Sequence, residues 1–125
     1  MLITDHIGAI LIVTGIITTL PLLQFFFPVQ VLKHLNRLEI HDEAGLFYAR
    51  HWGLLACSIG VLLIYAASHP EARAPIMLSA MLEKMGIVAL GILHRNRPYM
   101  QGMRIAVIFD ALCSLLYAIY LTGLL

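Results

Sequence analysis

The chain has 125 residues, of which 61% are hydrophobic and 12% charged, and its formal net charge is +1. A soluble domain is typically about 45–50% apolar and about 25% charged, so this composition favours a lipid bilayer as the surroundings. The length leaves room for a single membrane domain over residues 1–125. Nucleic acid requires a concentrated basic patch on its partner, and so small a net charge argues against one. We therefore expect no nucleic acid partner.

Motifs of the common catalytic, nucleotide-binding and metal-binding families are absent from the sequence, which contains no CxxC, GxGxxG, Walker or HExxH pattern. The two cysteines, Cys57 and Cys113, both lie within apolar segments. That position disfavours a disulfide framework and a thiolate metal site. We therefore expect no catalytic residue and no metal ligand.

The first apolar segment, residues 3–27, is close to the roughly 20 residues that a bilayer core requires. Pro21 should bend or loosen its last turns. Gly8, Gly15 and Thr18 recur at roughly heptad spacing, and small residues on one face let membrane helices approach each other closely. No Lys or Arg precedes the segment and no small-residue cleavage site follows it, so we expect a retained membrane helix rather than a signal peptide.

Residues 29–40 have the pattern of a short amphipathic helix in the first loop. Apolar side chains recur at helical spacing, at Val31, Leu32, Leu35 and Leu38. Polar side chains take the opposite face, at Lys33, His34, Asn36 and Arg37. Such a helix is best placed flat on the membrane surface.

Three more spans are expected over residues 44–67, 75–94 and 105–125, and Pro75 suits the first turn of the third span. Aromatic side chains near the span ends look like interfacial anchors: Tyr48, Trp52, Tyr65, Tyr99 and Tyr120. The predicted fold class is all-α, an integral membrane bundle of four transmembrane helices with one amphipathic interfacial helix.

Lys and Arg are distributed unevenly between the loops, which predicts the orientation of the chain in the membrane. The first and third loops contain Lys33, Arg37, Arg95, Arg97 and Arg104. The opposite side contains Arg73 alone. By the positive-inside rule, the first and third loops are cytoplasmic and both termini lie outside.

Away from the span ends, five Asp, Glu, Lys, Arg or His residues lie within the predicted spans: Arg50, His51, Glu83, Lys84 and Asp110. A charge at the centre of a membrane helix costs at least about 2.5–3.5 kcal/mol, so these groups need partners. From the rise per residue, Arg50, His51 and Asp110 enter from the same side to a depth of roughly 8–10 Å. We expect Arg50 to pair with Asp110, because a guanidinium fork matches a carboxylate.

Two explanations of these five residues stay open. They form either a buried site, open to the cytoplasm, for a proton, an ion, a quinone head group or a small polar ligand, or a structural cluster that fixes which helices pack together. Adjacent helical residues point about 100° apart, so Glu83 and Lys84 cannot both face the bundle centre.

No cofactor is predicted, although haem and quinone remain alternatives. Of the six histidines only His51 is expected within the core, which disfavours paired axial ligands to haem. Met77, Met81 and Met85 follow an i, i+4, i+8 pattern that could pass Cu(I) but is more typical of adaptable packing.

Three sequence features together resemble the small four-helix bacterial membrane proteins of the DoxX-like group and related families of unknown function. They are the glycine-punctuated first span GAILIVTGIITTL, the segment ARHWGLLACSIGVLLIYAA, and the pair Glu83-Lys84 in the third span. The resemblance covers most of the chain in layout. It implies a four-helix fold in a bacterial inner membrane and a link to respiratory or redox complexes, and it carries over no catalytic residue.

Three functional hypotheses follow. The first is a non-enzymatic protein that acts by association in the bilayer, as a homo-oligomer or an accessory subunit of a membrane complex. It rests on the absence of catalytic motifs, the small loops, and more small or polar helix faces than one four-helix core needs. The second is a small transporter, or a protein that binds a ligand, quinone or proton at the five-residue site. The third is a small membrane enzyme.

Overall fold

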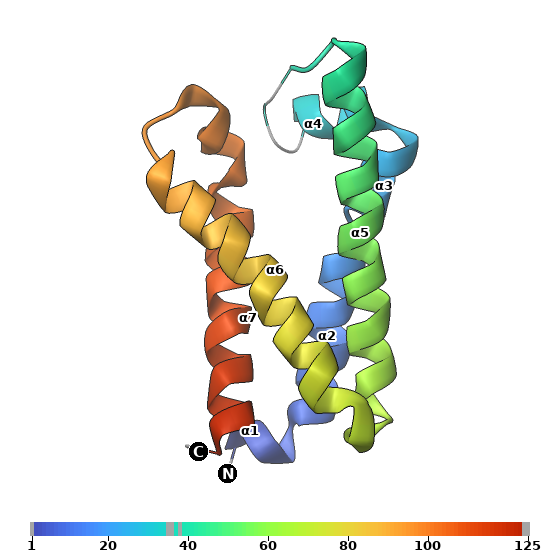
Figure 1. Ribbon diagram of the computed structural model, residues 1–125, viewed down its shortest axis with the longest axis vertical. Coiled ribbons are helices and arrows are strands. Elements are labelled where there is room, and N and C mark those ends of the chain that lie inside the picture. The colour runs from blue at the N-terminus through green and yellow to red at the C-terminus, as the bar shows by residue number, and fades with distance from the viewer. Residues whose placement is uncertain (1, 35–36, 38, 124–125) are drawn as a thin grey trace.

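The computed structural model describes residues 2–34, 37 and 39–123, and the regular structure in this part of the chain is helical (Figure 1). The long helices are α2 (Ile7–Thr19), α5 (Glu43–Ala67), α6 (Arg73–Leu93) and α7 (Arg104–Thr122). Shorter elements connect or precede them: α1 (Leu2–Asp5), α3 (Leu22–Phe26), α4 (Pro28–His34) and the 3₁₀ helices η1 (Pro70–Ala72) and η2 (Pro98–Met103).

Four segments are long and apolar enough to cross a bilayer: Ile7–Phe26, Glu43–Ala67, Pro70–Leu93 and Pro98–Thr122. Large apolar side chains such as Leu82 and Leu93 are exposed on these segments. A water-soluble monomer rarely exposes apolar surface on this scale, whereas lipid accommodates it. The expected all-α fold with four long apolar segments is therefore confirmed. The length and composition of these segments fit an integral membrane protein.

Pro21 interrupts the first of these segments. Helix α2 ends at Thr19 and α3 begins at Leu22, so the break falls on Leu20 and Pro21. Proline has no backbone N–H to donate and its ring clashes with the preceding turn. The bend expected at Pro21 is confirmed.

The amphipathic helix expected over residues 29–40 is shorter than the sequence pattern predicts. Helix α4 ends at His34, and Arg37 has a φ of 54°, in the left-handed region that a right-handed helix cannot continue through. Glu39 and Ile40 are not helical. Leu35, Asn36 and Leu38, which completed the expected pattern, lie outside the described residues.

Two antiparallel helix pairs build the molecule, α2 with α5 and α6 with α7 (Figure 1). Glycines permit the close approach of the first pair. A Cβ atom on Gly60 would lie 2.6 Å from the carbonyl oxygen of Gly15, and one on Gly53 would collide with the carbonyl oxygen of Pro21. The small-residue face predicted around Gly15 is thus used within the chain.

The two pairs meet at the end of the molecule where both termini lie, and they diverge towards the other end (Figure 1). The apolar core occupies the closed end, where Leu11, Leu63, Met77 and Tyr117 are all fully buried. A hydrogen bond of 2.6 Å between Thr14 Oγ1 and the Tyr117 hydroxyl joins α2 to α7 there. The divergence leaves space between the pairs, and the polar site lies where this space begins.

Candidate functional site

Lys84 on α6 and Asp110 on α7 form a buried ion pair. The ammonium nitrogen lies 2.9 Å from Asp110 Oδ1 and donates a second hydrogen bond of 3.1 Å to Thr18 Oγ1 on α2. Lys84 is 1% exposed, and the Asp110 side chain is 14% exposed. A buried ammonium is tolerated only with such partners, so the pair links three helices at one point.

A hydrogen bond within α2 orients the Thr18 hydroxyl for this contact. Its hydroxyl donates to the carbonyl oxygen of Thr14 at 2.6 Å, one turn earlier in α2. A hydroxyl has a single proton, so its lone pairs are left to accept from Lys84. The ammonium also lies 4.9 Å from the centre of the Phe109 ring, whose face attracts a cation. A carboxylate, a hydroxyl and an aromatic ring therefore hold the lysine.

A cavity of about 550 Å³ opens beside the ion pair, between the two helix pairs. Glu83, Lys84 and Asp110 line it, together with mostly apolar side chains such as Ile17, Ile87 and Phe109. The cavity thus has mainly apolar walls and one charged region.

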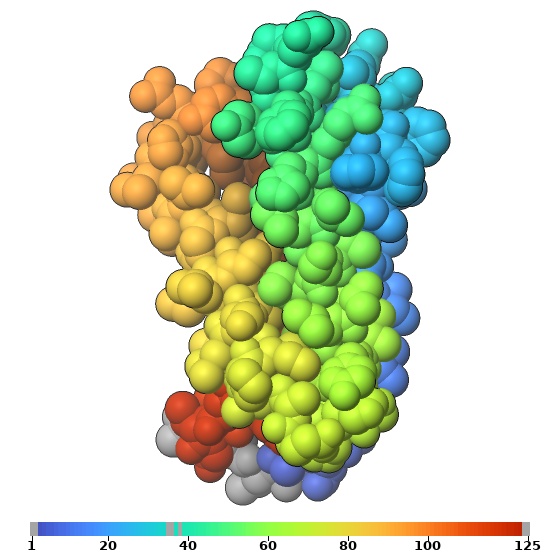
Figure 2. Space-filling model, turned by 45° about the vertical axis from the view of Figure 1, so that its right-hand side comes forward, coloured from blue at the N-terminus to red at the C-terminus, as the bar shows by residue number. Residues whose placement is uncertain are grey.

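A second cavity of about 470 Å³ adjoins the first, because Trp52, Ile87 and Met103 line both. It continues towards the open end, where His94 and Tyr99 line it. Figure 2 shows the surface hollowed there, between α5 and the end of α6. The space between the pairs therefore extends from the Lys84–Asp110 pair to the open end.

Glu83 also lines the first cavity, on the turn of α6 that carries Lys84. Its residue is partly exposed, but its Oε2 atom is buried and has no hydrogen-bond partner among the described residues. Leaving a buried polar oxygen unpaired is costly, and an unsatisfied group in a native fold calls for an explanation. Lys84 is buried in the interior and Glu83 is partly exposed, although both line the first cavity.

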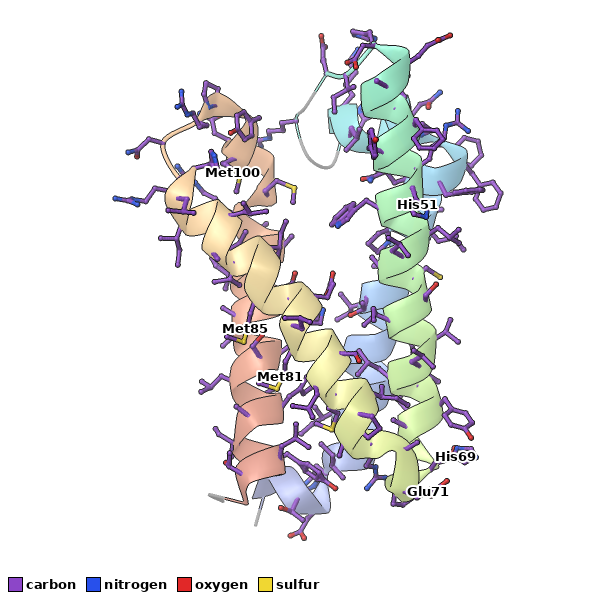
Figure 3. The ribbon with its side chains drawn as sticks, viewed as in Figure 1. His51, His69, Glu71, Met81, Met85 and Met100 are labelled. Carbon is purple, nitrogen blue, oxygen red and sulfur yellow. The ribbon has the colours of Figure 1, made fainter. Side chains whose placement is uncertain are left out.

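Arg50 and His51 do not belong to this site. Both are exposed on α5, and Arg50 Nη1 lies 3.4 Å from the carbonyl oxygen of Phe25 on α3 (Figure 3 labels His51). The expected Arg50–Asp110 pair is wrong, as is the expectation that His51 lies in the core. The glycine face of α5 packs on α2 and α3, so Arg50 reaches α3, while α7 lies across the cavity.

The three methionines of α6 lie in different surroundings. Met77 is buried in the core, Met81 packs at its edge, and Met85 is 55% exposed (Figure 3 labels Met81 and Met85). Their sulfur atoms therefore share no common site for Cu(I). No group of three His, Cys, Asp or Glu side chains in the described part of the chain is arranged to hold a metal ion.

Three residues contact the ammonium or line the cavities although the sequence did not predict it. Trp52 was expected as an interfacial anchor but lines both cavities, and Thr18 and Phe109 were not recognised as contacts of the ammonium. A usable signal existed for Thr18, because a hydroxyl on a small-residue helix face is a common partner for a buried polar group in membrane bundles.

Comparison with protein-family models, curated proteins and solved structures finds no match for this chain. The resemblance to the DoxX-like group therefore stays a prediction.

Proposed function

We propose that this chain is an integral membrane protein that binds a small amphiphilic molecule between its two helix pairs. The observation that supports the proposal is the 550 Å³ cavity that ends on the buried Lys84–Asp110 pair. Ligand sites typically have volumes of about 300–1,000 Å³, mostly apolar walls and a few polar groups that fix orientation. An amphiphile would direct its polar end to the ion pair and its apolar part along the walls.

The exposure of Asp110 to the cavity also supports binding over a purely structural role. A structural ion pair gains most when packing encloses both partners, because water and lipid are then excluded. Here Lys84 is enclosed, but Asp110 keeps part of its side chain open beside a cavity that Glu83 also lines. Ionisable groups within membrane segments are functional candidates by default.

Small-residue helix faces favoured association in the sequence, but the fold uses several of them within one chain. Gly15, Gly53 and Gly60 are used in the contact of α5 with α2 and α3, and a Cβ on Gly91 would lie 2.9 Å from Val107. These small faces therefore pack within one chain. Action as a homo-oligomer or as a subunit of a respiratory complex stays a prediction, as does a membrane enzyme.

We further propose that the open end of the molecule faces the cytoplasm of a bacterial cell. The first and third loops lie together at that end (Figure 1), and five of the basic residues named above belong to them. Positively charged loops are retained on the cytoplasmic side of the membrane. The termini would then lie on the outer side of the inner membrane.

Native mass spectrometry of protein extracted gently from its own membrane tests the proposal. Ala106→Phe should fill the cavity, because Ala106 lines it, while Ala111→Phe on an exposed position of the same helix is the matched control. We expect a small-molecule mass on the wild type and on Ala111→Phe, and its loss from Ala106→Phe. Equal occupancy in both variants, or a co-purifying protein chain with no small molecule, would contradict ligand binding in this cavity.

A further inference from the structure

Most hydrogen-bond donors of the ion pair and of its Thr18 partner are already in use. The Lys84 ammonium donates to Asp110 and Thr18, and the Thr18 hydroxyl donates to a backbone carbonyl. With Lys84 only 1% exposed, little of the ammonium is left for a ligand. A polar group that only accepts hydrogen bonds, such as a quinone carbonyl or a carboxylate, would find few donors here.

Acceptors, in contrast, remain available. Glu83 Oε2 is buried without a hydrogen-bond partner among the described residues. Lys84 engages Oδ1 of Asp110, and the Asp110 side chain keeps 14% of its surface exposed. The cavity therefore presents carboxylate oxygens that a donor could satisfy.

The site also contains more acidic groups than basic ones, which again favours a ligand that donates hydrogen bonds. Of the described residues lining the cavity, three can carry a charge, Glu83, Lys84 and Asp110, so the carboxylates outnumber the ammonium by one once both are ionised. In surroundings of low dielectric constant an uncompensated charge is costly, and a cation in the cavity would compensate it. An anionic ligand would add to the imbalance.

We infer that the ligand is an amphiphilic amine, whose protonated nitrogen donates hydrogen bonds to Glu83 and Asp110. Its apolar part would run past Trp52 and Ile87 into the second cavity of about 470 Å³. The inference rests on the proposed function and deepens it, because it assigns the chemistry of the polar end. Alkyl amines have a pKa near that of lysine, about 10.4, so the cation prevails at neutral pH.

Trp52 provides a direct probe of occupancy, because it is the single tryptophan of the chain and lines both cavities. Bromine atoms on a ligand chain quench tryptophan fluorescence at contact. The protein is reconstituted in phosphatidylcholine vesicles and titrated with brominated amphiphiles of one chain length, as the primary amine, the alcohol and the carboxylic acid. We expect quenching by the amine to saturate at a bilayer mole fraction at least about tenfold below that needed for the alcohol or the acid. We also expect the unbrominated amine to reverse the quenching.

Glu83→Gln keeps the shape of the side chain and removes its charge, and Glu71→Gln, at an exposed position in η1, is the matched control. We expect Glu83→Gln to weaken amine binding about tenfold, to leave binding of the alcohol unchanged, and to keep the helical circular dichroism signal, while Glu71→Gln behaves as the wild type. Amine binding unchanged by Glu83→Gln would overturn the inference.

The remaining outcomes separate the two proposals. Saturable quenching by the acid or the alcohol in preference to the amine overturns the amine inference and leaves ligand binding standing. Quenching that no probe saturates overturns both. Phosphatidylethanolamine added to the vesicles distinguishes the source of the amine: release of the bound brominated amine supports a lipid head group, and unchanged amine binding supports a free amphiphilic amine.

Discussion

Lys84 and Asp110 lie 2.9 Å apart where α6, α7 and α2 converge, and their pair forms the charged region of the cavity. One side of the pair is enclosed by packing, since Lys84 is buried against Thr18 and Phe109. The other side faces the cavity through Asp110. The pair can therefore stabilise the fold and contact a ligand at the same time, and variants can separate these two roles.

Asp110→Asn is expected to destabilise the protein, because it leaves the buried ammonium without its counter-charge. Removing one partner of a buried pair typically costs about 3–5 kcal/mol. Thermal unfolding in detergent, followed by circular dichroism, measures the effect. Asp42→Asn is the matched control: Asp42 caps α5 by accepting from Gly45 N at 2.7 Å, and asparagine caps a helix about as well. Equal melting temperatures for the two variants would show that Lys84 does not depend on Asp110.

Gly60→Ala is expected to disrupt the contact between α2 and α5. The added methyl group would lie 2.6 Å from the Gly15 carbonyl oxygen, and a backbone atom cannot move aside without shifting the helix. Overpacking of this kind costs about 1–3 kcal/mol. Gly86→Ala is the control, because nothing lies within 4 Å of a Cβ atom there. We expect the melting temperature to fall for Gly60→Ala and to stay level or rise for Gly86→Ala.

Tyr117→Phe tests the hydrogen bond that closes the core end. Thr14 Oγ1 donates to the Ile10 carbonyl oxygen at 2.7 Å, so the Tyr117 hydroxyl is the donor in its 2.6 Å bond to Thr14. After the substitution Thr14 still has a partner, and we expect a loss of about 0.5–1.5 kcal/mol, measured by denaturant unfolding in mixed micelles. Tyr65→Phe, at an exposed position, should change stability less, and the reverse order would contradict this assignment.

Arg73→Lys tests how α5 ends. The Arg73 side chain donates to the carbonyl oxygens of Ala66 and Ala67, at 2.9 and 2.7 Å, near the C-terminal end of that helix. A lysine ammonium lacks the planar fork that reaches both carbonyls, so we expect faster amide hydrogen exchange in the last turn of α5. Arg97→Lys, on the exposed third loop, should leave that exchange unchanged. Unaltered exchange in Arg73→Lys would show that other contacts fix the helix end.

Features determined by local sequence were predictable. Pro21 lacks the N–H that a helix needs, so the break in the first segment followed from residue type. Helical periodicity puts Asp110, Cys113 and Tyr117 on one face of α7, and Cys113 and Tyr117 are buried there. The amphipathic pattern over residues 29–40 did not reveal where α4 ends, because the left-handed conformation of Arg37 is not encoded by hydrophobic spacing.

Partner choice in the polar site was not predictable in the same way. Depth along a helix placed Arg50 and Asp110 at one level, but depth does not determine which helices are neighbours. The glycine contacts of α5 turned Arg50 towards α3, and the long stem of Lys84 let its ammonium reach Asp110. The cavity could not be predicted from the sequence either, because it arises from the divergence of two helix pairs and not from any single segment.

The most direct test of ligand binding at the Lys84–Asp110 pair combines Lys84→Met with Asp110→Leu, which replaces the ion pair by apolar groups of similar size. Such a replacement is typically tolerated by a fold, because neither partner of the ion pair is left behind as an unpaired buried charge. The protein is extracted from its own membrane, checked for helical content and size, and measured by native mass spectrometry. We expect a folded protein that has lost the bound small-molecule mass of the wild type. A folded double variant that keeps this mass at wild-type occupancy would contradict this expectation and show that the pair serves the fold alone.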